Sequence, residues 1–516
     1  MKSYKFSRLL LLMMVMVTIF VQCRKEALLP KTEDPDDPTR PAVVPEAAEV
    51  NTFVWSYMNY FYLWNDKVPN LSNPYYQMLT STSTNYKRNK DSLNVFLNKY
   101  TDPTKLFNDL LYQYKVVDKW SFIVSDYAIL ENWIAGISKT MGCDFQLYYL
   151  NSTSADIIGI VRYVVKGSPA ELAGVKRGDI FNKVDGVQLT DANYTANLIN
   201  KESFTLTFSK MTDNVLTPTG KTATMTAVQL QEDPIHFSKI LTVNGNNIGY
   251  LVYNGFTSDF DLQLNTLFQQ FKTAGISKLI LDLRYNGGGS VQTAIYLASM
   301  IYTTNSSKIF AKSVWNSNNT ENNGSDSFTD KITTTTSTAP INSLNMADIY
   351  FIVSSESASA SEMLINGLKP YMNVKVVGTN TVGKYVASTT IYDYARDSSG
   401  NLIPDGKGGY VKVSNHKYAM QPIIAKYANS LGVSDFVNGI APDITAKEDA
   451  GNLLPFGDEN ETLLKAVLDN IKGLKSQSID NPSGLANSKA IFGIKDKVRF
   501  SRDMYIDPRK LEKRTR

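Results

Sequence analysis

A serine and a lysine that could together carry out acyl transfer stand 25 positions apart in this 516-residue chain. The serine is Ser359, within the run 357–362, and the lysine is Lys384. A serine hydroxyl is a weak nucleophile until a base takes its proton. A lysine is such a base only when burial in apolar surroundings keeps it neutral. The chain has two histidines, so a serine–histidine site has few candidates, and the pair favours a Ser-Lys site.

Strand–helix–strand units are expected to position this pair. Apolar patterns predict strands at 278–284, 349–353 and 374–377, with helices at 290–302 and 360–368. Units of this length imply parallel strands with right-handed crossovers. Reaction sites in such sheets lie at the carboxyl ends of the strands, and Ser359 and Lys384 follow the ends of two neighbouring strands. One strand–helix–strand unit therefore predicts that both side chains reach the same edge of the sheet.

Donors for a developing oxyanion are expected beside the pair. The backbone N–H of Ala360 lies at a predicted helix start, and that of Gly288 lies in the glycine-rich turn 286–289. Amides at helix starts and in glycine turns suit an anion, and glycine lets the backbone approach a reacting carbonyl closely. These two amides are the candidate oxyanion hole.

A block of spaced glycines at 165–186 precedes the α/β region. Ser168 and the proline after it predict the start of a short helix, which Gly174 can end with a positive φ. Gly178 then predicts a turn into the next strand. This block resembles the core of a PDZ domain, which implies that an extended peptide is bound as an added strand. The loop that would hold the peptide carboxylate is Gly142, Cys143, Asp144 and Phe145.

Five segments together resemble the carboxyl-terminal processing peptidases, which are Ser-Lys endopeptidases with an embedded PDZ domain. The segments are 282–289, 357–362, 378–379, 383–384 and 439–444. The resemblance covers roughly residues 132–450 and places the PDZ domain ahead of the catalytic domain. It implies that Ser359 is the nucleophile, that Lys384 is the base, and that Gly288 and Ala360 donate to the oxyanion.

Three positions depart from the family pattern. Gly287 replaces a proline of the glycine turn, Tyr385 replaces a glycine after the lysine, and Ser388 replaces a glutamine that orients the lysine. Because a serine has a shorter reach, the third member of the site is left open between Ser388 and Glu362. Glu362 also has a purely structural interpretation, since its spacing from Ser359 is that of a capping box that starts a helix.

The N-terminus predicts export. Residues 1–22 contain three basic residues followed by an uncharged apolar run of thirteen residues, a pattern typical of a secretory signal. An apolar run that ends at Cys23 resembles a bacterial lipoprotein signal. That resemblance implies lipid attachment at Cys23 and a place in the cell envelope, periplasmic or associated with the outer membrane. The alternative is a plain signal peptide with an incidental cysteine.

Composition divides the chain into six parts. These are a signal peptide at 1–22, a disordered tether at 23–46, a helical domain at 47–131, a PDZ-like domain at 132–236, an α/β catalytic domain at 237–476 and a basic extension at 477–516. The helical domain has an aromatic core, and the proline-rich acidic tether has too little apolar area to order itself. We interpret the Ser-, Thr- and Asn-rich residues 303–345 as a polar insertion at the rim and the basic extension as solvated or weakly docked.

Several functions are disfavoured by what the sequence lacks. No cluster of residues has metal-ligand spacing and no phosphate loop is present, so neither a metal nor a cofactor is expected. The formal net charge is +4, and removing the three basic residues of 1–22 leaves +1, which gives no indication of nucleic-acid binding. We expect a lipid-anchored serine endopeptidase that acts on exported polypeptides. The alternatives are a peptide-binding lipoprotein whose protease fold has lost activity, and an esterase, which leaves the PDZ domain unexplained.

Overall fold

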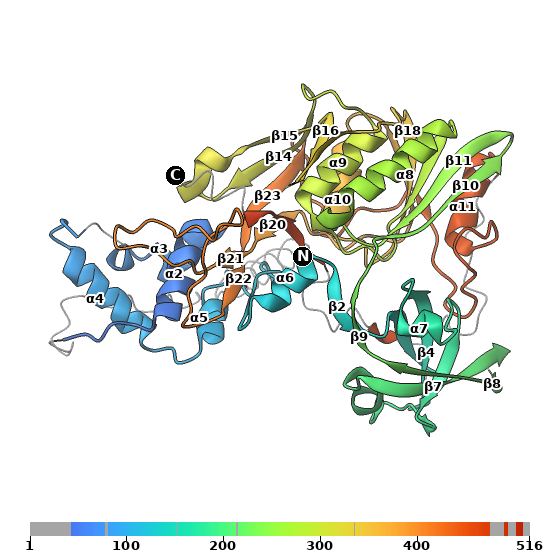
Figure 1. The fold of residues 1–516 in the computed structure, drawn as a ribbon, viewed down its shortest axis with the longest axis horizontal. Helices are drawn as coiled ribbons and strands as arrows, with labels where there is room; N and C mark the ends of the chain where they lie inside the picture. The colour runs from blue at the N-terminus through green and yellow to red at the C-terminus, as the bar shows by residue number, and fades with distance from the viewer. Residues whose placement is uncertain are drawn as a thin grey trace, which may run out of the picture. The chain divides into compact units, whose positions relative to one another are not determined.

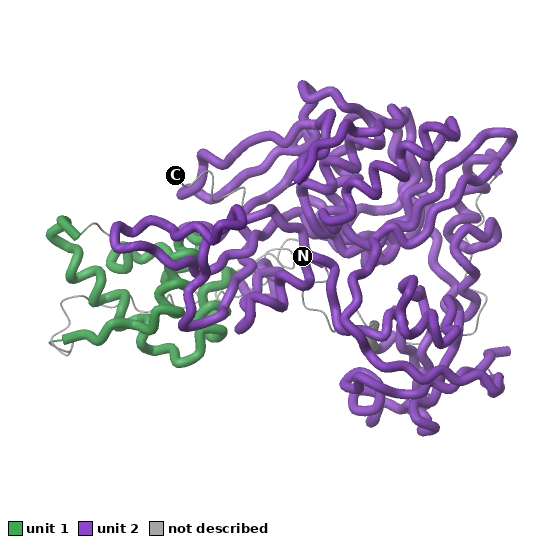
Figure 2. Tube along the Cα trace, viewed as in Figure 1, with its two compact units in different colours: residues 1–59, 64–112 green, residues 60–63, 113–516 purple. Residues whose placement is uncertain are grey.

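Two compact units make up the chain (Figure 2). The computed structural model describes residues 43–77, 81–151, 153–212, 215–334, 336–474, 490–493 and 502–508. The smaller unit extends to residue 59 and includes 64–112, and the larger unit contains 60–63 and 113 onward. Residues 113–131, assigned to the helical domain from sequence, thus belong to the larger unit. The predicted signal peptide and Cys23 lie outside the described residues. Within the described ranges, no helix has the length and apolar character needed to cross a membrane.

The smaller unit is helical. Its elements are α2 (Glu49–Phe61), η1 (Asn65–Lys67), α3 (Pro69–Ser72), η2 (Pro74–Tyr76), α4 (Tyr86–Leu97) and α5 (Pro103–Asp109). Trp55 is fully buried, and its indole N–H donates to the Asn70 carbonyl at 2.9 Å. The rings of Tyr76 and Phe96 stack with centroids 5.1 Å apart. The predicted helical region with an aromatic core is confirmed.

The larger unit contains the PDZ domain predicted from the glycine pattern. Its sheet has the order β25-β3-β4-β5-β7-β8, with β6 paired to β5. The strands are β25 (Ala490–Gly493), β3 (Cys143–Tyr149), β4 (Ile157–Val164), β5 (Ile180–Val184), β6 (Val187–Gln188), β7 (Ser203–Thr212) and β8 (Val215–Thr226). Ser168 caps the short helix α7 (Pro169–Leu172) by accepting a hydrogen bond from the Glu171 amide at 3.2 Å. Gly174 and Gly178 have φ of +76° and +88°, as expected.

The α/β domain is built on a six-stranded sheet with the order β10-β11-β12-β18-β19-β24. Figure 1 labels its strands β10, β11 and β18. The strands are β10 (Ile235–Val243), β11 (Asn246–Tyr253), β12 (Lys278–Asp282), β18 (Asp348–Val353), β19 (Asn373–Gly378) and β24 (Ile444–Thr445). Only the β10–β11 pair is antiparallel; the pairs from β11 to β24 are parallel. The mixed α/β fold with parallel strand–helix–strand units is therefore confirmed.

Helices bury the apolar faces of this sheet. The helices are α8 (Asp261–Thr273), α9 (Val291–Ile301), α10 (Ala360–Leu368) and α11 (Thr462–Ile471). Leu464 and Val467 of α11 share a buried cluster with Ile352 and Val377 of the sheet. The helix α10, whose nine residues are all buried, contacts α9 and also the strands β14 and β23 of a second sheet. This burial fixes the position of Ser359, the residue before α10.

The second sheet has the order β13-β26-β20-β23-β14-β15. Its strands are β13 (Gly289–Ser290), β26 (Met504–Ile506), β20 (Val386–Thr389), β23 (Ile423–Asn429), β14 (Ile309–Trp315) and β15 (Gly324–Ser327). The prediction of a polar rim insertion at 303–345 is wrong, because β14 carries the buried residues Phe310, Ala311 and Trp315. The prediction rested on the average composition of 303–345, and the many polar residues on either side of this short apolar strand dominate that average.

The remaining described elements are short helices and the strands of three small sheets. They are β1 (Phe122–Val124), α6 (Ala128–Ile134), β2 (Ile137–Thr140), η3 (Thr195–Ile199), β9 (Val228–Gln231), η4 (Ser258–Phe260), η5 (Ser317–Asn322), β16 (Lys331–Thr333), β17 (Thr338–Pro340), β21 (Ile391–Tyr392) and β22 (Ala419–Gln421). Strand β1 pairs with β22, and β2 pairs with β9.

The predicted solvated or weakly docked C-terminal extension is also wrong for its described parts. Strand β25 extends the PDZ sheet, and β26 lies inside the second sheet. Met504 is fully buried and Tyr505 is 6 % exposed. The many basic residues of the extension suggested a solvated segment, but the short apolar run 504–506 is long enough to form one strand.

Candidate active site

Ser359 has the backbone of a strained residue at a functional turn. Its φ of 66° and ψ of −113° are unusual for a residue that carries a side chain. Such conformations persist only where the surrounding structure enforces them. Ser359 is fully buried, and its hydroxyl has no hydrogen-bond partner among the described residues.

The two neighbouring serines have structural hydrogen bonds instead. The Ser357 hydroxyl donates to the Leu283 carbonyl at 2.7 Å, and the Ser361 hydroxyl donates to the Asn286 carbonyl at 3.0 Å. Both bonds tie the serine run to the turn that follows β12. Of the three alternating serines, Ser359 is therefore the one whose hydroxyl is left for chemistry.

Glu362 joins the nucleophile segment to the lysine segment. Its Oε2 accepts hydrogen bonds from the amides of Ser359 and Lys384, both at 2.8 Å, so these two nitrogens lie no more than twice that distance apart. Its Oε1 accepts from the Gly383 amide at 2.6 Å and from the Thr381 hydroxyl at 2.5 Å. Burial raises the pKa of Glu362, and these hydrogen bonds act against that rise. The capping interpretation is thus incomplete, because the same carboxylate also holds the lysine loop.

The Lys384 ammonium contacts two residues that the sequence did not indicate, Asp503 and Trp120. It forms a buried ion pair with Asp503, the residue before β26. The ammonium also lies 5.1 Å from the centroid of the Trp120 ring. The Ser388 hydroxyl donates to Asp503 Oδ1 at 3.3 Å and to the Met504 carbonyl at 3.2 Å. Burial raises the pKa of the Asp503 carboxyl, and the Lys384 charge acts to lower it.

The candidate oxyanion amides lie close together. A methyl group placed on Gly288 would be 2.7 Å from Ser359 Cβ and 3.1 Å from the Ala360 nitrogen. Ala360 is the first residue of α10, and amides in a first helical turn have no acceptor within the helix. The Gly288 amide instead donates to the Asn286 side-chain oxygen at 2.9 Å. The Ala360 amide is therefore the more available donor. The Gly288 amide can donate to an oxyanion only after it gives up its hydrogen bond to Asn286.

A cavity of about 1110 Å³ connects the PDZ loop with the glycine turn. The predicted loop residues Gly142, Cys143, Asp144 and Phe145 all line it, and so do Gly287, Gly288, Gly289, Asp503 and Tyr505. The cavity therefore reaches both the PDZ loop and the glycine turn.

Three of the predicted loop residues begin strand β3 and are buried. Burial raises the pKa of the Cys143 thiol to about 12, so this thiol is unreactive. Asp144 forms an ion pair with Arg162 of β4. Gly142, with φ +76°, donates its amide to the Thr140 hydroxyl at 3.0 Å.

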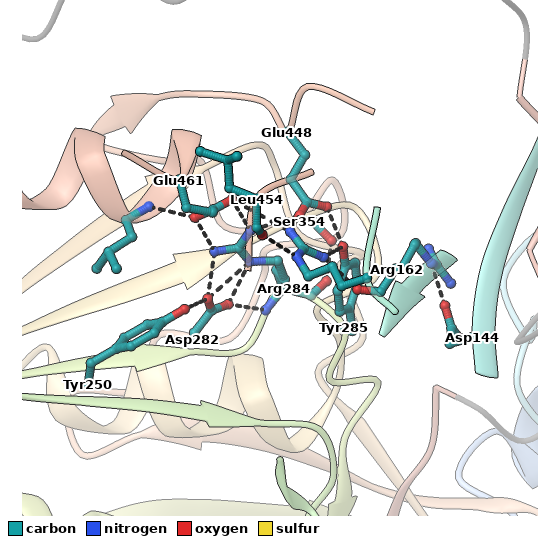
Figure 3. A network of polar contacts seen from close by, with 12 residues as sticks. Asp144, Arg162, Tyr250, Asp282, Arg284, Tyr285, Ser354, Glu448, Leu454 and Glu461 are labelled. Atoms are coloured by element: carbon teal, nitrogen blue, oxygen red, sulfur yellow. Dashed lines mark hydrogen bonds and ion pairs between the residues drawn. The ribbon is translucent and has the colours of Figure 1, made fainter. Parts of the chain in front are cut away.

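A buried ionic network supports the turn between β12 and the glycines (Figure 3). The Arg284 guanidinium pairs with Asp282 at 2.6 Å, with Glu461 at 2.6 Å and with Glu448 at 2.7 Å. An arginine with full burial is stable only when its charge is paired in this way. The network fixes the turn whose carbonyls receive the hydroxyls of the serine run.

The same network reaches the PDZ domain. Arg177 of that domain pairs with Glu448 at 2.7 Å and donates to the Tyr285 hydroxyl at 3.0 Å. Arg162 pairs with Glu356. Its guanidinium lies 4.9 Å from the ring centroid of Tyr285 (Figure 3). Ion pairs therefore link the PDZ domain to Glu356, which lies just before the serine run, and to Glu448, which also binds Arg284.

Sequence reasoning missed Asp503 and Trp120. Asp503 is 119 positions from Lys384, inside a basic segment, and only the apolar run that follows it could have suggested burial. Trp120 was counted in the helical core, but it belongs to the larger unit. Within the described ranges, no group of three or more His, Cys, Asp or Glu residues could hold a metal.

The fold and this site define an α/β domain with a buried serine–lysine arrangement and an attached PDZ domain. Family models match residues 247–446 as Peptidase family S41, residues 49–122 as Peptidase S41 N-terminal domain and residues 160–210 as PDZ domain. The chain therefore contains a Peptidase family S41 domain, with a Peptidase S41 N-terminal domain and a PDZ domain ahead of it.

Individual relatives agree with this assignment. The chain is 26% identical over 314 residues to a "Probable CtpA-like serine protease" of Staphylococcus aureus, covering 57% of this chain and 58% of that protein. It is 24% identical over 313 residues to a "Carboxyl-terminal-processing protease" of Picosynechococcus, covering 59% and 64%. The chain thus spans less than two thirds of either relative. A crystal structure assigned to the S41 proteases, from Bacteroides fragilis, has the same fold, with a TM-score of 0.63, 24% identity, and coverage of 84% of this chain and 100% of that one.

Proposed function

We propose that this chain is a serine endopeptidase in which Ser359 is the nucleophile and Lys384 the base. The observation that carries the proposal is the shared carboxylate of Glu362, which binds the backbone of both residues and so holds them at one edge of the sheet. The strained Ser359 backbone and its unbonded hydroxyl are consistent with this role. The family match supplies the reaction class.

The reaction runs through an acyl-enzyme. Neutral Lys384 takes the proton from the Ser359 hydroxyl as the oxygen attacks the peptide carbonyl. The Ala360 amide donates to the resulting oxyanion, joined by the Gly288 amide once it leaves Asn286. Protonated Lys384 then gives its proton to the leaving amine. In the second half, Lys384 takes a proton from water as the water oxygen attacks the ester, and it then gives that proton to the Ser359 oxygen as the acid leaves.

The PDZ domain captures an unstructured polypeptide tail. The cavity shared by the predicted PDZ loop and the glycine turn supports this part of the proposal. Such a tail adds as a strand, and backbone amides of the loop bind its carboxylate.

We further propose that the protein is an exported lipoprotein acylated at Cys23. The support is the N-terminal sequence pattern, and the relatives named above are bacterial. Palmitate labelling of the expressing cell should depend on Cys23, and labelling retained in a Cys23→Ala chain would disprove the attachment site.

The test of the peptidase proposal is serine-dependent cleavage. Purified protein, its Ser359→Ala variant and its Lys384→Ala variant are incubated with β-casein, an unstructured polypeptide, and the fragments are identified by mass spectrometry. We expect fragments from the unaltered protein and none from either variant. Equal fragments from protein and Ser359→Ala variant would refute the peptidase proposal, and full activity of Lys384→Ala would refute the mechanism alone.

A further inference from the structure

The C-terminal extension adds a strand to the edge of the PDZ sheet. Strand β25 pairs antiparallel to β3, with Ala490 opposite Tyr148 and Gly493 opposite Gln146. The extension therefore advances along β3 toward its first residue, Cys143, and the predicted carboxylate loop. Addition of an extended segment to a sheet edge is the way PDZ domains bind peptides. The extension thus has the direction of a peptide that approaches the carboxylate loop.

The same extension then fills a strand position beside the active site. Strand β26 runs parallel to both β13 and β20: Met504 is opposite Gly289, and Tyr505 is opposite both Ser290 and Ser388. The Thr389 hydroxyl also donates to a carbonyl of this strand at 2.9 Å. A second extended chain cannot pair with these same edges while β26 occupies them.

Residue Asp503 completes the blockage. Its carbonyl oxygen would lie 2.6 Å from a methyl group placed on Gly288, the point that is also within contact of Ser359 and the Ala360 amide. Its carboxylate pairs with the Lys384 ammonium. A reacting peptide carbonyl needs the space beside Ser359 and the Ala360 amide. Attack by the Ser359 hydroxyl needs a neutral Lys384. Asp503 lies in the space beside Ser359 and Gly288, and its carboxylate holds the Lys384 ammonium in an ion pair.

We propose that strands β25 and β26 make the C-terminal extension an intramolecular ligand of its own PDZ edge and active-site groove, which excludes polypeptide substrates until it is displaced. This inference rests on the proposed peptidase function. Because the extension is covalently attached, it competes with a substrate at an effective concentration on the order of 1 mM. A substrate that enters both the PDZ edge and the groove gains enough contacts to displace it.

The first test measures cleavage of β-casein by purified Asp503→Asn and Tyr505→Pro variants. Asparagine removes the charge that pairs with Lys384, and proline prevents β26 from pairing. We expect kcat/KM to rise by about tenfold or more, given the effective concentration of a tethered ligand. The control is Asp507→Asn, which makes the same charge change in the same segment and should leave the rate unaltered. A lower rate in Asp503→Asn would overturn the inference, since Asp503 would then orient Lys384.

The second test does not depend on activity. Ser359→Cys is combined with Tyr505→Pro or with Asp507→Asn, and alkylation of residue 359 by iodoacetamide is followed by peptide mass spectrometry. The extension should shield the thiol in the Asp507→Asn chain and expose it in the Tyr505→Pro chain. Equal alkylation rates would overturn the inference even if casein cleavage is serine-dependent. Exposure without any serine-dependent cleavage would support the inference and contradict the peptidase function.

Discussion

Glu362 shows how one buried carboxylate can align two segments that are far apart in sequence. Three of its four donors are amides, those of Ser359, Lys384 and Gly383, and the fourth is the Thr381 hydroxyl. The carboxylate has only acceptors and can satisfy all four donors. Its contribution to the site is therefore one of position, exerted through the main chain.

A Glu362→Gln variant should lose both stability and alignment. The glutamine side chain has only one acceptor oxygen. Its NH₂ group would face two of the four donors that Glu362 accepts from and would leave them without an acceptor. Each unpaired buried donor costs about 1–3 kcal/mol. We expect a lower free energy of unfolding in urea and a fall in kcat larger than any change in KM. Glu321→Gln, an exposed position, is the matched control and should alter neither quantity. Unchanged kcat would show that the carboxylate is a helix cap and no more.

At the scale of elements, the lysine loop is crossed by the segment that leads to β24. The Ile440 amide donates to the Thr381 hydroxyl at 2.6 Å, and the Thr381 amide donates to the Ile440 carbonyl at 3.2 Å. Gly439 makes this crossing possible, because a methyl group there would lie 2.0 Å from the Thr381 carbonyl oxygen. The crossing therefore helps to position Lys384, which follows three residues later.

Gly439→Ala and Gly432→Ala separate backbone strain from close approach. The two glycines have nearly the same φ, +84° and +86°, but Gly432 has open space where its methyl group would lie. Gly432→Ala should cost about 1–2 kcal/mol from the left-handed backbone alone. Gly439→Ala should cost more and should lower kcat, because the lysine loop must shift. Urea unfolding and casein cleavage measure the two effects. Equal losses in both variants would mean that the crossing does not position Lys384.

How much the sequence predicted depends on the length and periodicity of each element. The strands ending near 282, 353 and 377 and the helix 360–368 were predicted because their apolar patterns are long and regular, and their bounds in β12, β18, β19 and α10 agree closely. That placed Ser359 and Lys384 at one edge. Asp503 was not predictable, because an ion pair across 119 positions leaves no periodic signal. Strand β14 was also not predicted, because polar residues dominate the composition of the surrounding range 303–345.

At the scale of the whole molecule, Glu448 connects the PDZ domain to the catalytic turn. It accepts from Arg177 of the PDZ domain and from Arg284, both at 2.7 Å, and from the Tyr285 hydroxyl at 2.6 Å. Burial acts to raise the pKa of Glu448, but the two arginines outweigh it and lower the pKa to about 2. The ionised carboxylate is thus stabilised by the folded state.

This shift gives stability a defined pH dependence. Because the folded pKa of about 2 lies below the ordinary value of 4.5, the contribution of Glu448 is fully present above about pH 4.5 and is lost as the pH falls toward 2. Glu448→Gln should therefore lower the free energy of unfolding by about 3–5 kcal/mol at pH 7, since it breaks a buried ion pair. The difference between protein and variant should shrink steadily between pH 4.5 and 2.

Urea titrations at pH 7, 4.5 and 3 measure that difference, and Glu459→Gln, an exposed carboxylate close by in sequence, is the control. Comparison of variant with parent at each pH removes the titration of all other acids. A difference that stayed constant from pH 7 to 3 would mean that Glu448 is not the ionised partner of the two arginines. If the difference shrinks as expected, the ionised Glu448 joins Arg177 of the PDZ domain to Arg284 of the catalytic turn. Loss of Glu448 should then also weaken the dependence of cleavage on the PDZ domain.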